Sequence, residues 1–352
     1  MQQLELPVLC NVPAREAMLC NAPGRDFTFY ATFDVDSLCS YIPAGTAVLL
    51  PASSWARDQL SRPRIPTYIT DTGADSGGFV ASRIWGDYRY SLEQYTAWLS
   101  SWSPRWAATM DYCCEPELQV ITRDRQEKTT ANIRAAWSRY QWASWAWVPT
   151  IQGVLPEDYQ RHASELKPLL EDMRDHYADN PAWRVGIGTL CRRDDVTIIQ
   201  AIVNAVRDVL PGYPLHLWGI KLDALRSIRL DQVASTDSAV WHGSMYAGDE
   251  IAEKAAQAGM SRRAYKVKVN LPCYVEKVYA AVGESRRVQA AQEDQALISR
   301  ARAALKAQGW SINIRTRRNR QYVYAARRTG KYIEQRSICP VSELATWLSA
   351  KG

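Results

Sequence analysis

The chain has 352 residues, of which 47% are hydrophobic and 23% are charged, as in an ordinary soluble globular protein. No apolar run approaches the roughly 20 residues of a membrane span, and the first residues lack the basic start and apolar stretch of a secretory signal. We therefore expect a cytoplasmic protein with no membrane partner. The length exceeds that of a usual single domain unless the fold is a barrel.

The net charge of +6 is distributed unevenly along the sequence. Residues 301–352 hold eleven Lys or Arg against Glu334 and Glu343, a charge of +9, which leaves −3 for residues 1–300. A mildly acidic body followed by a strongly basic segment indicates a polyanionic partner that this segment binds.

Eight cysteines are scattered through the chain without the dense framework of small disulfide-rich domains, so we expect reduced thiols. Metal ligation needs clustered spacing such as Cys-x-x-Cys, which no pair shows, and the four histidines are too dispersed for a metal cluster. The neighbouring Cys113 and Cys114 are interpreted as packing residues near a strand end. The sequence therefore predicts no metal site.

Short runs typical of β-strands recur through the first 235 residues, with helical patterns between several of them. The expected strands cover residues 27–33, 47–50, 67–70, 107–110, 145–150, 184–187, 215–219 and 232–235. Amphipathic helices are expected at 123–140, 156–177 and 194–210. This alternation predicts parallel strands joined by right-handed crossovers. Eight strands would close a (β/α)8 TIM-type barrel of the α/β class, whereas six would leave an open doubly wound sheet.

The pattern changes after residue 237. Helices are expected at 248–258 and 287–308, with the stretch between them unassigned, and Gly309 stops the second helix. Strands are then expected at 311–315, 321–325 and 331–338, with a turn at 328–330 between the last two. A terminal helix is expected at 341–348. We expect two domains, a barrel over 1–285 and a small basic α+β module over 286–352.

Three aspartates, Asp75, Asp111 and Asp237, stand just past short apolar strands at widely separated positions. Residues at the carboxyl ends of barrel strands converge on one mouth, and glycosidic-bond chemistry needs such paired carboxylates. We favour the barrel because these carboxylates follow so many different strands. Asp75 opens a run with two glycines, Asp75-Ser76-Gly77-Gly78-Phe79, which lets the backbone approach a flat ligand closely. The alternative is a strand-to-helix turn capped by Asp75.

Further elements follow this run in a fixed order. They are Asp111, Ile151-Gln152-Gly153, Gly186-Ile187-Gly188-Thr189-Leu190, His216-Leu217-Trp218-Gly219 and Asp237. The series resembles the tRNA-guanine transglycosylase superfamily, and most closely its DNA-acting branch, the 7-deazaguanine DNA transglycosylases (DpdA-type). The similarity runs from about residue 67 to 243. No single element is specific, but six in the correct order at plausible spacing are fairly specific.

The resemblance implies a glycosyltransferase that exchanges guanine in DNA for a free 7-deazaguanine base such as 7-cyano-7-deazaguanine, without a redox or nucleotide cofactor. It implies that Asp237 attacks C1′ of the nucleoside and forms a covalent glycosyl-aspartate intermediate. A second group must protonate the leaving base and deprotonate the incoming one, and Asp75 is the expected acid/base residue. Asp71, four residues earlier, is a rival for this role.

The resemblance also implies which residues contact the base. An ionised Asp111 would accept hydrogen bonds from N1–H and the exocyclic amine of guanine. The donors to O6 would be the Gln152 side chain and backbone N–H groups around Gly153, Gly188 and Thr189. The expected base-binding set also includes Ser76, Gly77, Gly78, Phe79 and Leu190. Without the family pattern, Gln152 would be interpreted as a loop residue bonded to the backbone.

Basic residues interleave with Tyr322, Tyr324 and Tyr332 on or beside a predicted hairpin of the C-terminal module. They are Arg315, Arg317, Arg318, Arg320, Arg327, Arg328 and Lys331. We expect them to bind DNA phosphates, with an affinity that falls steeply with salt; a merely solvated basic face is the alternative. A guanine stacked in a duplex is out of reach, so the enzyme would flip its target or act on unpaired DNA.

One departure from the family concerns zinc. The tRNA-acting enzymes carry a Cys-x-Cys-x-x-Cys element followed by His after the nucleophile, whereas this chain has only Cys273 and Cys339 there. Zinc is therefore doubtful, and DNA is favoured over tRNA as the substrate. Guanine exchange in tRNA and a catalytically silent nucleic-acid-binding barrel are the alternatives. Glycoside hydrolysis ranks below them, because the basic segment does not suit it.

The chain holds fourteen Trp against four Phe. Most of these tryptophans are expected in the core, including Trp98, Trp102 and Trp106, which stand at helical spacing. Trp85 and Trp241 are expected near the mouth, where they would stack on a base or flank its pocket.

Overall fold

The computed structural model describes residues 27–33, 42–55, 60–118, 121–242, 250–307, 309–317, 320–329 and 332–349. The chain divides into two compact units, Met1–Val282 and Gly283–Gly352. Each unit is described by itself below.

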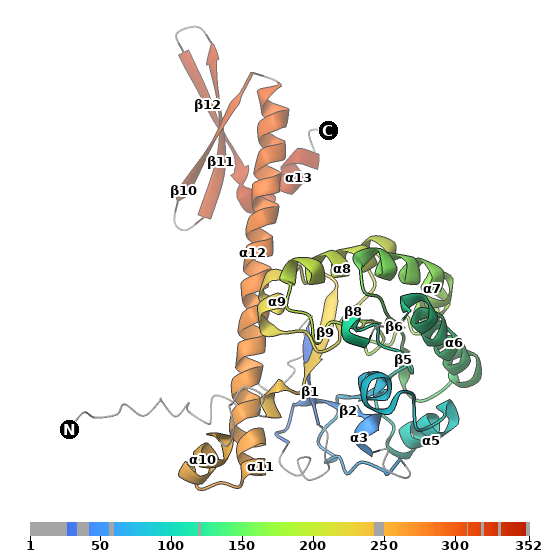
Figure 1. Ribbon diagram of the computed structural model, residues 1–352. Helices are drawn as coiled ribbons and strands as arrows, with labels where there is room; N and C mark the ends of the chain where they lie inside the picture. The colour runs from blue at the N-terminus through green and yellow to red at the C-terminus, as the bar shows by residue number, and fades with distance from the viewer. Residues whose placement is uncertain are drawn as a thin grey trace, which may run out of the picture. The chain divides into compact units, whose positions relative to one another are not determined.

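The first unit is built around parallel strands, which pair in the order β5-β4-β3-β2-β1-β9-β8-β7-β6 (Figure 1). In chain order they are β1 (Thr28–Thr32), β2 (Ala47–Pro51), β3 (Thr72–Asp75), β4 (Trp106–Ala108), β5 (Ala146–Val148), β6 (Thr150–Ile151), β7 (Val185–Ile187), β8 (Leu215–Leu217) and β9 (Val233–Ser238). Every strand pairs with neighbours that run in the same direction, which is the arrangement expected from the alternating pattern.

The ring closes through one interrupted strand. Only Pro149 separates β5 from β6, and β5 pairs with β4 while β6 pairs with β7. Proline has no backbone N–H to donate to a neighbouring strand. Its carbonyl still accepts a hydrogen bond from the Gly186 N–H at 2.8 Å. The first unit is therefore a nearly closed (β/α)8 TIM-type barrel, as predicted.

One strand lies elsewhere than the sequence predicted. Residues 67–70 form a turn, in which the Ile69 N–H bonds to the Pro66 carbonyl at 3.0 Å, and β3 follows at 72–75. The run Thr-Gly-Ala-Asp has little strand propensity, which explains the error. Tertiary packing decides instead: a Cβ on Gly73 would lie 2.3 Å from the Trp106 indole, so only glycine lets β3 pass this ring.

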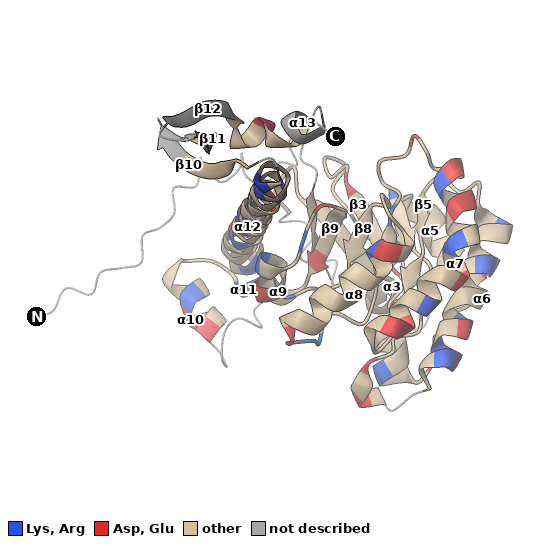
Figure 2. Ribbon diagram, turned by 90° about the horizontal axis from the view of Figure 1, so that it is seen from above, with Lys and Arg blue, Asp and Glu red and all other residues tan. Residues whose placement is uncertain are grey.

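Helices cover the outside of the barrel (Figure 1). They are α5 (Leu92–Trp102), α6 (Thr122–Tyr140), α7 (Pro156–His176), α8 (Val196–Val209) and the short α9 (Leu222–Ser227). In α8 the buried residues Ile199, Ile202, Val203 and Val206 recur at helical spacing, so one face packs on the strands. Figure 2 shows charged residues of both signs along α6 and α7, as on solvent-facing helix surfaces.

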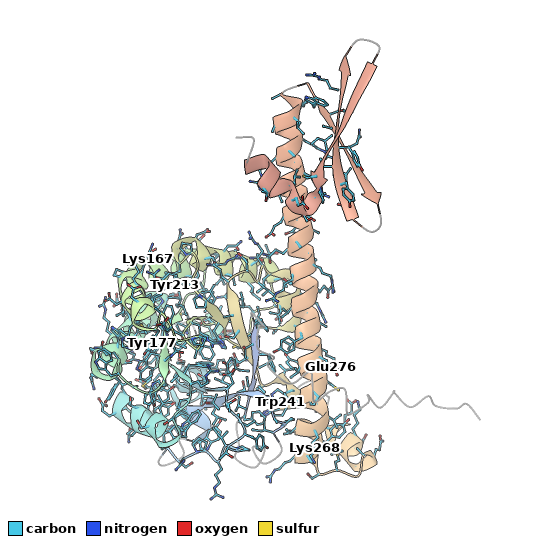
Figure 3. The ribbon with its side chains drawn as sticks, turned by 180° about the vertical axis from the view of Figure 1, so that it is seen from behind. Lys167, Tyr177, Tyr213, Trp241, Lys268 and Glu276 are labelled. Atoms are coloured by element: carbon cyan, nitrogen blue, oxygen red, sulfur yellow. The ribbon has the colours of Figure 1, made fainter. Side chains whose placement is uncertain are left out.

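Shorter elements connect these pieces. They are α3 (Ala52–Trp55), α4 (Gly78–Val80), η1 (Ala81–Trp85), η2 (Pro116–Leu118), η3 (Val240–His242), α10 (Glu250–Gln257), α11 (Arg262–Tyr265) and η4 (Lys266–Asn270). The η3 turn is tied to η4, since the Asn270 side chain donates to the Trp241 carbonyl at 3.4 Å, and Figure 3 labels Trp241 and Lys268 in this region.

The helix α12 (Leu271–Lys306) begins well before the expected residue 287. Its first turns pack on the barrel through Tyr274 and Val278, which are buried, and the Tyr274 ring lies 5.7 Å from that of Phe29. Figure 3 labels Glu276 in this part. This stretch is rich in Val and Tyr, which are weak helix formers, so its helical state comes from packing that propensity does not reveal. No helix of the described residues is both long and apolar enough to span a membrane.

The second unit contains an antiparallel sheet in the order β10-β11-β12. Its strands are β10 (Ser311–Arg317), β11 (Arg320–Thr329) and β12 (Tyr332–Pro340), followed by η5 (Val341–Glu343) and α13 (Leu344–Ser349). Its core joins sheet and helix through Ile298, Ala301, Val323, Val341 and Leu344. The three strands and the terminal helix predicted from the sequence are confirmed, whereas the predicted turn at 328–330 falls partly within β11, and Gly330 lies outside the described residues.

Candidate active site

A cavity of about 560 Å³ lies where several barrel strands end. Asp75 is the last residue of β3, Asp111 follows β4, and Asp237 lies near the end of β9. All three carboxylates line this cavity. Its volume lies within the range of small-molecule sites, roughly 300–1,000 Å³. The structure thus brings the three aspartates together in one space, although more than 160 residues separate the first from the last.

Asp75 is held by the glycine turn that follows it. Its Oδ1 accepts a hydrogen bond from the Gly77 N–H at 3.0 Å, and Gly77 adopts a positive φ of 77° that favours glycine. The pKa of Asp75 is raised to about 7, mainly by burial; the hydrogen bond from Gly77 opposes this shift, and the nearby charges of Asp111 and Asp237 add to it. A carboxyl with this pKa exchanges its proton near neutral pH.

Asp111 is almost fully buried and is held on both oxygens. The Ser76 hydroxyl donates to Oδ1 at 2.9 Å, and the Gln152 side-chain amide donates to Oδ2. Burial raises the pKa of Asp111, and these two hydrogen bonds oppose that shift. Gly78 is required beside it, because a Cβ at this position would lie 2.4 Å from Oδ1.

Two tyrosines that the sequence analysis did not single out brace this wall. The Tyr88 hydroxyl donates to the Asp111 carbonyl at 2.8 Å and accepts from the Asp111 N–H at 3.0 Å. The Tyr90 hydroxyl donates to the Ser76 carbonyl. The Tyr-x-Tyr spacing after the glycine turn is the signal that was available, but it is not specific without coordinates.

Gln152 bridges the walls of the cavity. Its side-chain oxygen accepts a hydrogen bond from the Thr189 hydroxyl at 2.6 Å, while its amide nitrogen binds Asp111. Thr189 has a positive φ of 55°, and its hydroxyl accepts from the Cys114 N–H at 3.0 Å. A Cβ on Gly188 would lie 2.3 Å from Gln152 Nε2. The side chain of Gln152 is therefore part of the site, and the alternative of a loop residue bonded to backbone does not describe it.

Asp237 accepts hydrogen bonds on both oxygens. The Gly219 N–H donates to Oδ1 at 2.8 Å and the Thr32 hydroxyl donates to Oδ2 at 3.1 Å. His216 Nε2 lies 3.4 Å from Oδ1 on the buried side of the carboxylate. These contacts come from β1, β8 and the turn after β8, so three separate elements fix the orientation of one carboxylate.

Some expected base-contacting residues do not line the cavity. Ser76 is buried behind Asp111, to which its hydroxyl donates, and the Gly77 N–H donates a hydrogen bond to Asp75. Gly153 packs against Tyr159, and Leu190 is a fully buried core residue. Gly78, Phe79, Asp111, Gln152, Gly188 and Thr189 do line it.

Asp71, the rival acid/base residue, lies just before β3 and does not line the cavity. It accepts a hydrogen bond from the Tyr30 hydroxyl at 2.8 Å and lies 3.7 Å from Arg105 Nη1. Because its oxygen is engaged at the opposite end of the strand from Asp75, the geometry favours Asp75.

The expectation that Trp85 and Trp241 flank the pocket is wrong. Trp241 is fully buried and packs 4.8 Å from the Phe33 ring, and Trp85 packs against Tyr90. The aromatic lining comes instead from Phe79 and from Trp218 at the end of β8. The aspartates were identified because residues at the carboxyl ends of barrel strands meet at one mouth, which we call the strand-end rule. The same rule would also have identified Trp218.

Gly219 also lines the cavity and belongs to one of the elements found in the sequence, whereas other lining residues were missed, namely Thr32, Cys113, Glu115, Cys191, Ser238, Ala239, Val240 and His242. Glu115 is 1% exposed, and the Cys191 thiol lies 3.5 Å from its Oε1 as a donor. Burial raises the pKa of Glu115. Its second oxygen, Oε2, has no partner among the described residues. No sequence pattern distinguishes this glutamate from a surface one.

The basic residues of the second unit lie largely on its sheet. Arg327 is exposed, and its guanidinium stacks 4.8 Å from the Trp310 ring. Arg315 and Arg317 lie on β10, and Arg320 and Arg328 lie on β11. Arg318 and Lys331 fall outside the described residues.

After Asp237 the sequence holds two cysteines, whereas the zinc site of the tRNA-acting enzymes needs three cysteines and a histidine. Cys273 lies in α12 within the first unit, and Cys339 lies in β12 of the second. Among the described residues, no three His, Cys, Asp or Glu side chains gather as metal ligands would. The residues present therefore do not fit that zinc site.

Comparison with known proteins identifies one family. The model of DpdA, described as DeoxyPurine in DNA protein A, matches residues 41–263, well over half of the chain, and this range contains every cavity residue except Thr32. No curated protein matches the sequence. Among solved structures, Rhizobium etli pyruvate carboxylase aligns over 79% of this chain and 29% of its own, at 12% identity and a TM-score of 0.34, which supports no argument. The family match establishes that the chain belongs to the DpdA family.

Proposed function

We propose that this protein is a base-exchange transglycosylase, which replaces guanine in DNA with a 7-deazaguanine base such as 7-cyano-7-deazaguanine. The observation that carries this proposal is the convergence of Asp75, Asp111 and Asp237 on one cavity of about 560 Å³ in a chain of the DpdA family. The three carboxylates have different surroundings, and each set of surroundings suits a different role.

Asp237 is the proposed nucleophile. One of its oxygens forms a bond to C1′ as the bond from C1′ to the base nitrogen breaks, and the base leaves with the electron pair. The hydrogen bonds from Gly219 and Thr32 hold the carboxylate in one orientation for this attack. The product of the step is a covalent glycosyl-aspartate, which the incoming base then attacks in the reverse sense.

Asp75 is the proposed acid/base group. Its pKa of about 7 suits a residue that must donate a proton to the leaving guanine and then take one from the incoming base. In its protonated form it supplies that proton, and the ionised form that results is ready for the second half of the exchange. The reaction as proposed assigns no step to a metal, a redox group or a nucleotide cofactor.

Asp111 and Gln152 are the proposed readers of the guanine edge. Each carboxylate oxygen of Asp111 has a further lone pair to accept from N1–H and the exocyclic amine. The Gln152 amide has two hydrogens, of which one binds Asp111, so the other is available for O6. Because the Gln152 oxygen is occupied by Thr189, this amide cannot rotate without breaking two hydrogen bonds. The Phe79 ring adds an apolar surface for the purine.

The second unit is proposed to bind the DNA backbone. It provides phosphate contacts that position the substrate, whereas the cavity reads the base after it has been flipped or met in unpaired DNA. This division between backbone binding and base recognition follows the charge difference between the two parts of the sequence.

Mass spectrometry of nucleosides tests the function directly. DNA incubated with the protein and 7-cyano-7-deazaguanine should acquire the deazapurine nucleoside and release free guanine. A parallel incubation with tRNA should show no exchange. Exchange in tRNA alone would overturn DNA as the substrate, and binding of DNA without any exchange would identify a silent barrel.

Trapping of the intermediate tests the nucleophile. Denatured wild-type protein should retain a covalent DNA adduct, which should be absent in Asp237→Asn and Asp237→Ala. An adduct of unchanged yield in these variants would remove Asp237 from the role of nucleophile.

A further inference from the structure

His216 is a buried group that the reaction outlined above does not use. It lies on β8 with 0% exposure, and its ring is packed between those of Trp106, at 5.3 Å, and Trp218, at 4.3 Å. It does not line the cavity, so it cannot contact a substrate there. Its two ring nitrogens nevertheless face defined polar groups: Nδ1 lies 2.8 Å from the Ser235 hydroxyl, and Nε2 lies 3.4 Å from Asp237 Oδ1.

A buried arginine fixes the direction of the hydrogen bond at Ser235. Arg184 Nη1 lies 2.6 Å from the Ser235 oxygen. A guanidinium keeps its proton and has only donors, so Ser235 must accept this hydrogen bond. The hydroxyl hydrogen of Ser235 then remains to be donated, and His216 Nδ1 stands at the right distance to accept it.

Arg184 is itself held rigidly. Its Nε donates to the Ala182 carbonyl at 2.9 Å, and its guanidinium stacks 5.5 Å from the Tyr30 ring and 5.4 Å from the Trp106 ring. It is 5% exposed. This buried cation therefore keeps one position in the barrel interior and always acts as a donor. It fixes the direction of the hydrogen bonds that lead from Ser235 to the active site.

The tautomer of His216 follows from these directions. Burial lowers the pKa of His216, so the ring is neutral and carries one hydrogen. If Nδ1 accepts from Ser235, that hydrogen lies on Nε2 and points toward Asp237 Oδ1. The carboxylate favours the same tautomer independently, because the alternative would set a nitrogen lone pair against its negative oxygen. The 3.4 Å separation is long for a hydrogen bond, and Nε2 has no closer partner among the described residues; hydrogen bonds in catalytic sites often shorten once substrate is bound.

We propose that Arg184, Ser235 and His216 form a positioning relay, which presents an N–H from His216 Nε2 to Asp237 Oδ1 and fixes the orientation of the nucleophilic carboxylate. None of the three touches the substrate. This inference rests on the proposed function for its catalytic consequence, but the tautomer it requires is a property of the free protein. Together with the Gly219 N–H, the relay gives Oδ1 two donors from the barrel side.

Nitrogen-15 NMR of histidine-labelled protein tests the relay without any substrate. The chain has four histidines, and the signal missing in His216→Gln assigns this ring. The expected spectrum shows a neutral ring with hydrogen on Nε2 and a bare Nδ1. A hydrogen on Nδ1, or a doubly protonated ring, would overturn the relay even if base exchange is confirmed.

Rates of guanine release in a single turnover give the second readout. His216→Phe keeps a planar apolar ring and removes the donor, so we expect a loss of about 100-fold, the typical cost of one preorganised donor, with DNA affinity unchanged. His216→Gln can place an amide N–H near the Nε2 position and should recover much of that loss. Equal rates in the Phe and Gln variants would refute the relay. Absence of guanine release in the wild-type protein would instead refute the proposed function and leave the NMR result standing.

Discussion

Gly188 lies so close to Gln152 that no side chain can replace its hydrogen: a Cβ would stand 2.3 Å from Gln152 Nε2. Gly188→Ala should therefore push the amide away from Asp111 and remove a donor from the base-reading wall. Loss of one such hydrogen bond costs about 1–2 kcal/mol, so we expect an affinity for the 7-deazaguanine base that is weaker by about 5- to 30-fold. Equilibrium titration with the free base measures this change.

Gly283→Ala is the matched control for that substitution. Gly283 lies within α12, and the nearest atom to a Cβ there would be an Arg287 side-chain nitrogen at 4.0 Å. The change should leave base affinity intact and stabilise the helix by about 1 kcal/mol. Equal losses of base affinity in both variants would show that the close approach of Gly188 to Gln152 has no special role.

The raised pKa of Asp75 predicts a conflict between stability and function. A carboxyl whose pKa rises from 3.8 to about 7 on folding contributes stability below about pH 4, and this contribution is lost as pH rises toward 7. Asp75→Asn cannot ionise, so it should be more stable than the wild type at pH 8 by roughly 2–4 kcal/mol, and about equally stable at pH 4. Denaturant unfolding at the two pH values measures the difference, and a less stable variant at pH 8 would contradict the buried charge.

The same group predicts the pH dependence of guanine release. Asp75 must be protonated to supply the leaving base with a proton, so the single-turnover rate should fall tenfold per pH unit above about pH 7. In Asp75→Asn this alkaline limb should disappear along with most of the activity. A rate that stays level up to pH 9 in the wild type would assign the proton to another group.

The arginines on β10 and β11, which we call the basic sheet, predict that DNA binding by the second unit weakens as the salt concentration rises. Replacing Arg315, Arg317 and Arg320 by Gln should weaken DNA binding and reduce the slope of log affinity against log salt. The reduction should reach about 2.7, or about 0.9 for each DNA phosphate that the protein no longer neutralises. Binding isotherms at several salt concentrations give this slope.

A matched removal of three charges from the first unit serves as the control for this prediction. Arg134, Lys167 and Lys277 lie on α6, α7 and α12, and Figure 3 labels Lys167. Their replacement by Gln should leave the slope nearly unchanged. Equal effects of the two triple variants would mean that net charge, rather than the basic sheet, governs binding.

The strand-end rule was sufficient to predict Asp75, Asp111 and Asp237, because their positions depend on the barrel topology that alternating strands and helices specify. The strand before Asp75 was misplaced, however: the sequence indicated residues 67–70, whereas β3 covers Thr72–Asp75, where the Trp106 ring leaves no room for a Cβ on Gly73. The rule also gave no access to Glu115 or to the His216 relay. Those contacts depend on side chains from distant elements meeting at particular distances, and a single sequence carries no record of such distances.

The interruption at Pro149 has a mechanical consequence. The segment that carries Gln152 pairs with β7, while Asp111 follows β4, which pairs with β5 on the other side of the break. The hydrogen bond between Gln152 and Asp111 therefore connects the two sides of this break in the barrel. It lies at the position where a purine would bind. Binding of a base to both side chains should therefore hold the two sides of the break together, so amides flanking Pro149 should exchange with deuterium more slowly once the base is bound.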